Sequence, residues 1–135
     1  MRPRILIVMA VSAVFSAALL SAQSESDYQG WMKTVGATTD SLLKNVAAKD
    51  AAAVTASAQT LQDTFKQVEM FWDKRGVADA VNFAKLAQTV AATVVKDAAA
   101  GNMDQATTDT NSLAAACGGC HTAHRQKTFT GFKIK

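Results

Sequence analysis

Residues 54–72 read VTASAQTLQDTFKQVEMFW, and the apolar positions in this stretch decide the fold. Successive apolar side chains are separated by 4, 3, 4, 3 and 4 residues. The positions are Val54, Ala58, Leu61, Phe65, Val68 and Trp72. An α-helix with about 3.6 residues per turn places them on one face, as in the seam between packed helices. The stretch therefore predicts a long helix that buries one side in a helical bundle.

The flanking sequence predicts three further helices. Apolar and small side chains recur with a helical period over about 27–47, 77–100 and 103–127. The only proline of the chain is Pro3, so no proline interrupts these segments. Residues 128–135, TFTGFKIK, are expected to form a short irregular tail.

Typical helix-ending and helix-starting residues separate the four segments. Asp50 is a suitable N-cap for the helix that contains the quoted stretch, and Gly76 is suited to end that helix. Gly101 ends the third helix, and Asn102 with Gln105 three residues later predicts a variant of the capping box for the fourth. Four helices joined by tight turns indicate an all-α fold, an antiparallel up-down-up-down four-helix bundle.

Residues 1–22 have the pattern of a secretory signal peptide. Arg2 and Arg4 precede an uncharged apolar run over 5–20, and small residues follow at Ser21 and Ala22. The alternative is an uncleaved membrane anchor, but the run is shorter than the roughly 20 apolar residues that span a bilayer. We therefore expect cleavage near Ala22, no stable membrane anchor afterwards, and a periplasmic or otherwise exported domain over 23–135.

The charge of the expected mature domain is close to neutral. Without Arg2 and Arg4 the chain carries 12 Lys and Arg against 11 Asp and Glu, a net charge of +1. The basic residues are scattered and are not interleaved with aromatic residues. The sequence therefore shows no nucleic-acid-binding footprint.

The sequence Cys117-Gly118-Gly119-Cys120-His121 holds both cysteines of the chain and one of its two histidines. On a helix, these three soft ligands and His124 fall on one face. A disulfide between two cysteines this close would constrain little of the chain, although an exported compartment is oxidising. The motif therefore calls for a chemical explanation.

Three chemistries suit such a cluster. C-x-x-C-H is the signature of covalent haem attachment, in which two thiols add to the haem vinyl groups and the imidazole binds iron. A Cys2His2 zinc site has suitable ligands, but four donors on one helix face do not surround a tetrahedral ion. A thiol–disulfide redox pair lacks the helix N-terminus that normally activates the thiol. Haem attachment is the interpretation that spacing, order and export favour.

The motif C-x-x-C-H-x-x-x-R near the end of a four-helix, signal-bearing chain resembles the class II c-type cytochromes, namely cytochrome c′ and the low-spin cytochromes c-556. The matching residues are Cys117, Cys120, His121 and Arg125. The resemblance implies one haem c, attached through the two cysteines between the helices, with His121 as proximal iron ligand. It also implies that Arg125 tunes the proximal side or meets a haem propionate; a solvated cation near the helix end is the alternative.

In that family the opposite side of the iron faces the first helix, which here reads YQGWMK over 28–33. Met32 aligns with the distal position. If it binds, the iron is six-coordinate and low-spin, as in an electron carrier; if Met32 only fills the core, the iron is five-coordinate and open to NO or CO. Tyr28 departs from the family pattern, which usually has a basic residue there.

These observations predict an exported mono-haem c-type cytochrome that carries out outer-sphere electron transfer with low-spin His121/Met32 iron. The alternative is a five-coordinate, cytochrome c′-like NO- or CO-binding protein. Neither is an enzyme. The expected partners are redox proteins, and small apolar positions on the first two helices permit two bundles to pair as a homodimer.

Overall fold

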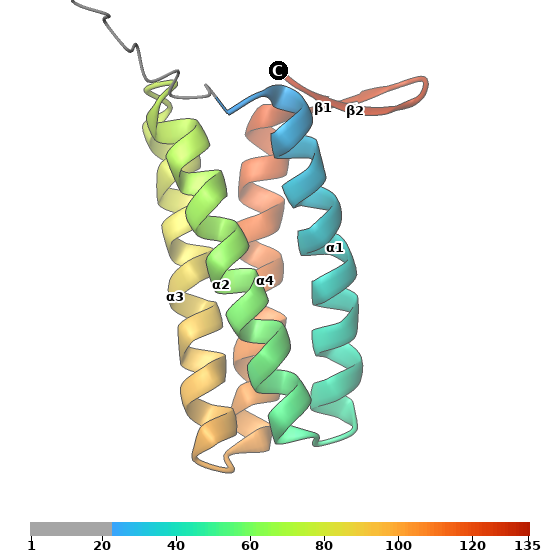
Figure 1. Cartoon of the computed structure of the whole chain (residues 1–135), viewed down its shortest axis with the longest axis vertical. Helices are drawn as coiled ribbons and strands as arrows, with labels where there is room; N and C mark the ends of the chain where they lie inside the picture. The colour runs from blue at the N-terminus through green and yellow to red at the C-terminus, as the bar shows by residue number, and fades with distance from the viewer. Residues whose placement is uncertain (1–22) are drawn as a thin grey trace, which may run out of the picture.

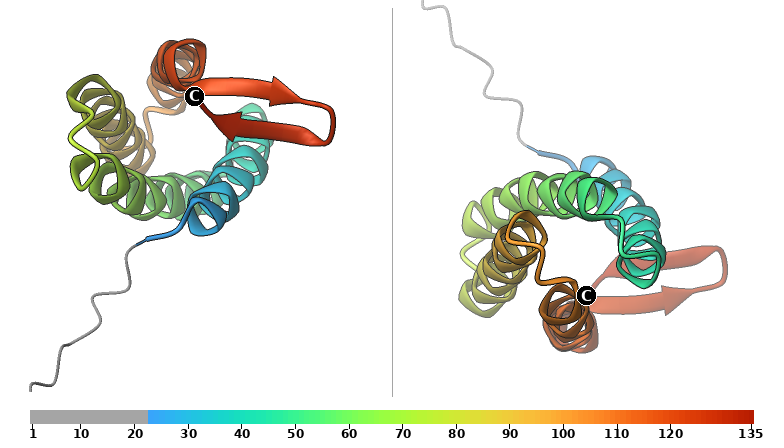
Figure 2. Two further views of the ribbon diagram at one scale, coloured as in Figure 1. Left: turned by 90° about the horizontal axis from the view of Figure 1, so that it is seen from above. Right: turned by 90° about the horizontal axis from the view of Figure 1, so that it is seen from below.

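A computed structural model of the chain describes residues 23–135. Four helices pack side by side and alternate in direction, as the sequence predicted, and a small two-stranded sheet follows them (Figures 1 and 2). The elements are α1 (Glu25–Ala47), α2 (Ala51–Asp73), α3 (Ala78–Ala99), α4 (Met103–His124), β1 (Arg125–Thr128) and β2 (Gly131–Ile134). The predicted signal peptide lies outside the described residues.

The quoted stretch forms the seam of α2, and all six of its predicted positions are buried. Asp50 caps this helix as expected, because its side chain accepts a hydrogen bond from the backbone N–H of Ala53. Gly76 and Gly101 follow α2 and α3 with φ angles of 69° and 77°. This left-handed conformation costs glycine little, so both residues turn the chain as predicted.

The buried side of α3 is made mostly of alanine. Its buried positions are Ala80, Val81, Ala84, Ala87, Ala91, Val94 and Ala98. The larger apolar residues Phe83 and Val90 are only half-buried beside this stripe. The small alanine side chains form the centre of the contact, and the larger residues lie at its edges.

Two predictions about α4 are wrong in detail. Asn102 occupies the N-cap position, but its side chain makes no capping hydrogen bond, and Gln105 instead donates to the carboxylate of Asp109 at 3.2 Å. The helix also ends at His124, before the predicted limit of 127.

The expected irregular tail is an antiparallel hairpin. Arg125 pairs with Ile134 and Thr128 pairs with Gly131, which leaves a two-residue turn at Phe129 and Thr130. The half-buried Ile134 packs against the core and holds the base of the hairpin to the bundle. This long-range contact explains why the segment packs against the bundle as a hairpin. No helix within residues 23–135 is long and apolar enough to span a membrane.

Candidate functional site

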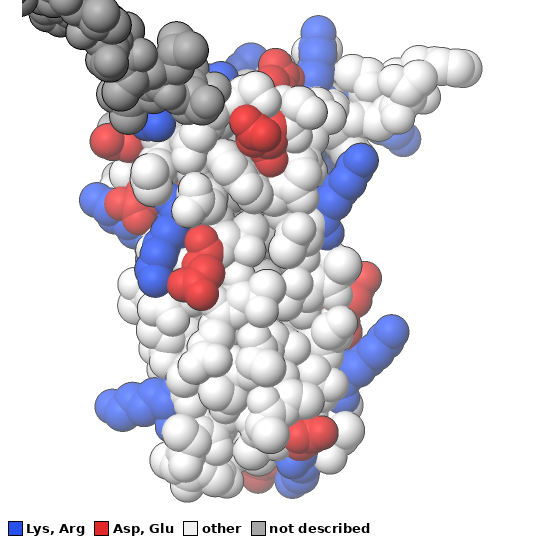
Figure 3. All heavy atoms as spheres, viewed as in Figure 1, with Lys and Arg blue, Asp and Glu red and all other residues white. Residues whose placement is uncertain are grey.

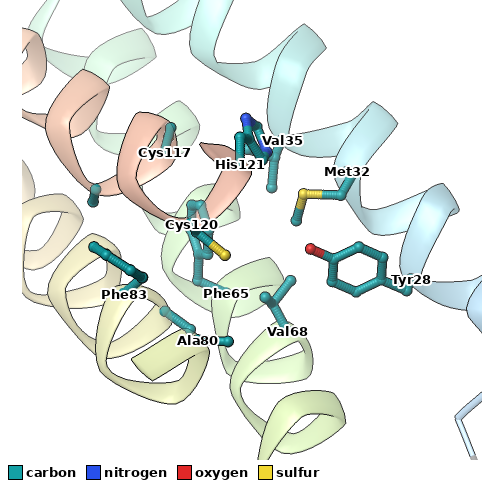
Figure 4. A pocket seen from close by; sticks show the side chains of 12 residues that line it. Tyr28, Met32, Val35, Phe65, Val68, Ala80, Phe83, Cys117, Cys120 and His121 are labelled. Carbon is teal, nitrogen blue, oxygen red and sulfur yellow. The ribbon is translucent and has the colours of Figure 1, made fainter. Parts of the chain in front are cut away.

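An apolar pocket lies between the four helices toward the hairpin end of the bundle (Figure 4). Each helix contributes part of its wall, with Val35 from α1, Phe65 and Val68 from α2, Ala84 from α3 and Ala116 from α4. The unfilled space is about 350 Å³, including the part that is open to solvent. A pocket of this lining favours an apolar ligand held by a few polar or soft groups.

Helix α4 contributes three side chains to this pocket that can act as soft ligands. Cys117, Cys120 and His121 all line the pocket, so the helix brings these three residues to one place as the sequence predicted. All three are half-buried, and both cysteines are free thiols. Residues three and four positions apart are neighbours on a helix surface, which accounts for this shared direction. His124 was predicted on the same face, but it contacts Asp79 of α3 instead.

Burial sets the protonation state of these groups. It raises the pKa of the Cys117 thiol and, together with the nearby carboxylate of Asp79, raises the pKa of the Cys120 thiol to about 11. Burial, with the guanidinium of Arg125 adding to it, lowers the pKa of His121. At neutral pH the site therefore presents two protonated thiols and a neutral imidazole. The neutral imidazole is the form that binds metals, whereas the scarcity of thiolate disfavours thiol–disulfide exchange.

Two side chains of α1 face the motif across the pocket. Figure 4 shows the thioether of Met32 and the hydroxyl of Tyr28 reaching toward the space beside Cys120 and His121. Met32 is half-buried and packs against the core. The resemblance predicts Met32 as the distal residue, and the fold brings it to the same pocket as His121.

Tyr28 is a core residue whose hydroxyl end reaches the pocket. Its side chain is 8% exposed, and its ring stacks on Phe71 with centroids 4.5 Å apart. Burial raises the pKa of Tyr28 to about 12, so the phenol remains protonated and able to donate a hydrogen bond.

Arg125 and His124 do not line the pocket. The Arg125 guanidinium carbon lies 4.1 Å from the centre of the Phe132 ring, within the hairpin. His124 faces α3, where its Nε2 lies 2.8 Å from Oδ2 of Asp79. Arg125 still contacts the motif through the backbone, because its N–H donates to the carbonyl of His121.

The role of Phe83 is not among the predictions from the sequence. Its ring lies so close to Gly119 that a Cβ on this glycine would be 2.7 Å from Cζ of Phe83. A glycine in the interior of a helix is a signal for such a close approach. Gly118 shows that the signal is ambiguous, because a Cβ there would meet nothing within 4 Å.

The donor set fits a covalently attached haem. Two thiols one turn apart and an imidazole lie on one side of an apolar pocket, with a thioether on the other. The unfilled space of about 350 Å³ includes the part that is open to solvent, and the ring of Phe83 lies directly against Gly119. A flat macrocycle would therefore require wall residues such as Phe83 to move outward.

The donor set fits a zinc ion less well. Within residues 23–135, no three His, Cys, Asp or Glu side chains lie together in a way that could hold a metal ion.

No protein-family model, curated protein or solved structure matches the chain.

Proposed function

We propose that this chain is an exported mono-haem c-type cytochrome of the class II type and that it carries single electrons between redox partner proteins. One observation supports the proposal above the others. Cys117, Cys120 and His121 of α4 line the same apolar pocket as Met32 of α1. The resemblance of the motif to the class II cytochromes supplies the name of the cofactor, one haem c.

Each residue of the pocket has a distinct task in this proposal. The Cys117 and Cys120 thiols would hold the group through thioether bonds, and the neutral imidazole of His121 would bind the iron. Met32 would supply a thioether as a further iron ligand. When bound, the haem supplies an iron that takes up or releases one electron. A thioether ligand raises the reduction potential of that iron, in keeping with a low-spin carrier.

The rest of the pocket surrounds this site with apolar side chains. Phe65 and Val68 give α2 an apolar wall, and the alanines of α3 allow close helix packing. An apolar, closely packed surrounding limits the reorganisation that accompanies a change of charge. The Tyr28 hydroxyl is the polar group best placed to donate a hydrogen bond within the site.

Optical spectra of the full chain, produced with a c-type maturation system, test this proposal. We expect covalent haem in the wild type and its loss in the double variant Cys117→Ser/Cys120→Ser. We also expect a low-spin spectrum with a far-red Met–iron band in the ferric state. The host should also produce a known c-type cytochrome as a control. If that cytochrome carries haem but this chain is isolated without it, the proposal is overturned.

A pair of methionine variants tests the assignment of Met32. Met32→Ala should abolish the far-red band, whereas Met70→Ala should leave it unchanged, because Met70 is 47% exposed and does not line the pocket. A high-spin wild-type spectrum that shifts on addition of CO would make the protein a five-coordinate gas binder and Met32 a residue of the core.

A further inference from the structure

The C-terminal hairpin, residues 125–135, has a composition unlike that of the bundle. It carries four basic side chains and no Asp or Glu. The basic residues are Arg125, Lys127, Lys133 and Lys135. Residues 128–132, which form the tip, are uncharged and include two phenylalanines. The hairpin therefore has an uncharged, aromatic tip, and its basic residues lie toward the end that joins the bundle.

The tip is exposed and projects from the side of the bundle. Phe129 in the turn is 106% exposed, and Phe132 is 50% exposed. Figures 1 and 2 show the hairpin extending outward from the end of α4. In Figure 3 the projecting tip is white, and Lys and Arg side chains lie nearer the bundle. A fully exposed phenylalanine in a turn adds nothing to the core, so packing within the bundle does not explain it.

The base of the hairpin is held in place. The backbone N–H of Ile134 donates to the carboxylate of Glu25 at 3.3 Å, and that of Lys135 donates to the carbonyl of His124 at 3.0 Å. The Lys135 ammonium donates to the carbonyl of Thr122 at 2.8 Å. The bundle therefore presents the tip in a defined direction. Presentation in this way reduces the entropy lost on docking.

We propose that the hairpin docks onto a bilayer that contains anionic phospholipid, with Phe129 in the interface and the basic residues at the headgroups. Aromatic rings favour the membrane–water interface, and Lys and Arg extend their charges to the headgroup phosphates. The inference does not depend on a haem in the bundle.

The distribution of charge favours a fluid surface over a folded protein partner. Lys127 pairs with Phe132, whereas Lys133 pairs with Gln126, so the two lysines project from opposite faces of the hairpin. Headgroups can surround an inserted hairpin on both faces. A rigid acidic surface would meet one face and leave the other lysine in solvent.

Co-sedimentation with vesicles tests the proposal on the protein as isolated. The lipids are phosphatidylcholine alone, or phosphatidylcholine with about a third phosphatidylglycerol. We expect binding to the anionic vesicles only, with loss at about 0.5 M salt because screening removes the attraction. Lys127→Gln/Lys133→Gln should weaken binding about 25-fold, at roughly five-fold for each charge. Phe129→Ser should weaken it about ten-fold.

Matched variants at the other end of the bundle serve as controls. Lys44→Gln/Lys96→Gln removes the same charge, and Leu43→Ser removes a large exposed apolar side chain. Both should bind as the wild type does. Equal binding to the two kinds of vesicle, or hairpin variants that bind like the wild type, would overturn the proposal. So would retention on immobilised polyglutamate without vesicle binding, which would identify an acidic protein as the partner.

Discussion

Gly119 of α4 lies directly against the ring of Phe83 on α3. A Cβ at this position would approach Cζ of Phe83 to 2.7 Å and Cδ1 to 3.3 Å. The neighbouring Gly118 lies on the same helix and has open space beside it. The two glycines between the cysteines therefore have different structural roles, although nothing in the sequence distinguishes them.

This difference predicts opposite effects of alanine. Gly118→Ala should raise the free energy of unfolding by about 0.5–1 kcal/mol, because alanine has the higher helix propensity. Gly119→Ala gains the same propensity but forces Phe83 to move, at an overpacking cost of about 1–3 kcal/mol. We expect a net loss of about 1 kcal/mol in urea unfolding.

A second-site change separates the steric cause from other effects of Gly119→Ala. Phe83→Leu shortens the side chain that the new methyl group meets, so it should restore most of the lost stability in the double variant. Equal gains in stability for Gly118→Ala and Gly119→Ala would show that α3 and α4 are not in close contact at this point.

Tyr28 is the only tyrosine of the chain, so its ionisation can be followed alone. Burial raises its pKa to about 12, from the ordinary tyrosine value of 10.0. The difference in absorbance at 295 nm between wild type and Tyr28→Phe should therefore rise near pH 12. A transition near pH 10 would place the hydroxyl in solvent.

The same shift predicts how stability changes with pH. The unfolded chain loses the tyrosine proton near pH 10, whereas the folded chain keeps it until about pH 12. The contribution of Tyr28 is therefore complete below pH 10 and falls by about 2 kcal/mol as pH rises to 12. Urea unfolding at a series of pH values should show this loss in the wild type, and Tyr28→Phe should lack it.

Local patterns determined the parts of the fold that were predicted correctly. The seam of α2 and the cap at Asp50 depend on spacing and on residues close in sequence, and both are confirmed. Cys117, Cys120 and His121 were also predicted correctly to cluster, because they lie close together in the sequence. One helix turn brings these residues together whatever the rest of the bundle does.

Contacts between distant segments account for the parts that were missed. The hairpin depends on Ile134 reaching the core and on Glu25 accepting its N–H, and neither contact is visible in the tail sequence. Phe83 lies beside the motif because of the rotation of α3, which its alanine stripe sets. Helical spacing read from the large apolar residues therefore predicts the wrong centre for the buried face of α3, because that centre is alanine.

The contact between His124 and Asp79 joins the end of α4 to the start of α3. Nε2 of His124 lies 2.8 Å from Oδ2 of Asp79, and this hydrogen bond lowers the pKa of the Asp79 carboxyl. A lowered pKa means that the stabilisation is present above pH 3.8 and is lost as pH falls through the folded value. Asp79→Ala should therefore be less stable than wild type at pH 7, and the difference should shrink below pH 3.8.

Urea unfolding from pH 3 to pH 7 measures this change. Asp40→Ala is the control, because Asp40 forms no ion pair with any other residue of 23–135. Its difference from wild type should vary less with pH. A stability difference for Asp79→Ala that stays constant across the range would show that the contact with His124 is not maintained in solution.

Asp97 of α3 and Asp109 of α4 bring two carboxyl groups together at the helix interface. The nearby carboxyl of Asp109 raises the pKa of Asp97, and burial adds to the effect. A raised pKa means that the contribution of Asp97 to stability is complete below pH 3.8 and is lost as pH rises through the folded value. At pH 7 the pair therefore destabilises the fold.

Asp97→Asn removes one of the two charges and lets the new amide donate to Asp109. The variant should therefore be more stable than wild type at pH 7 in urea unfolding. The gain should shrink as pH falls through the folded pKa of Asp97 and should be absent below pH 3.8. Asp109→Asn should gain less stability than Asp97→Asn. Gln105 donates to both carboxylate oxygens of Asp109 at 3.2 Å, and this interaction weakens when the carboxylate loses its charge. An equal gain for the two variants would mean that the Gln105 contact contributes nothing, and a loss for Asp97→Asn would mean that the carboxylates do not meet.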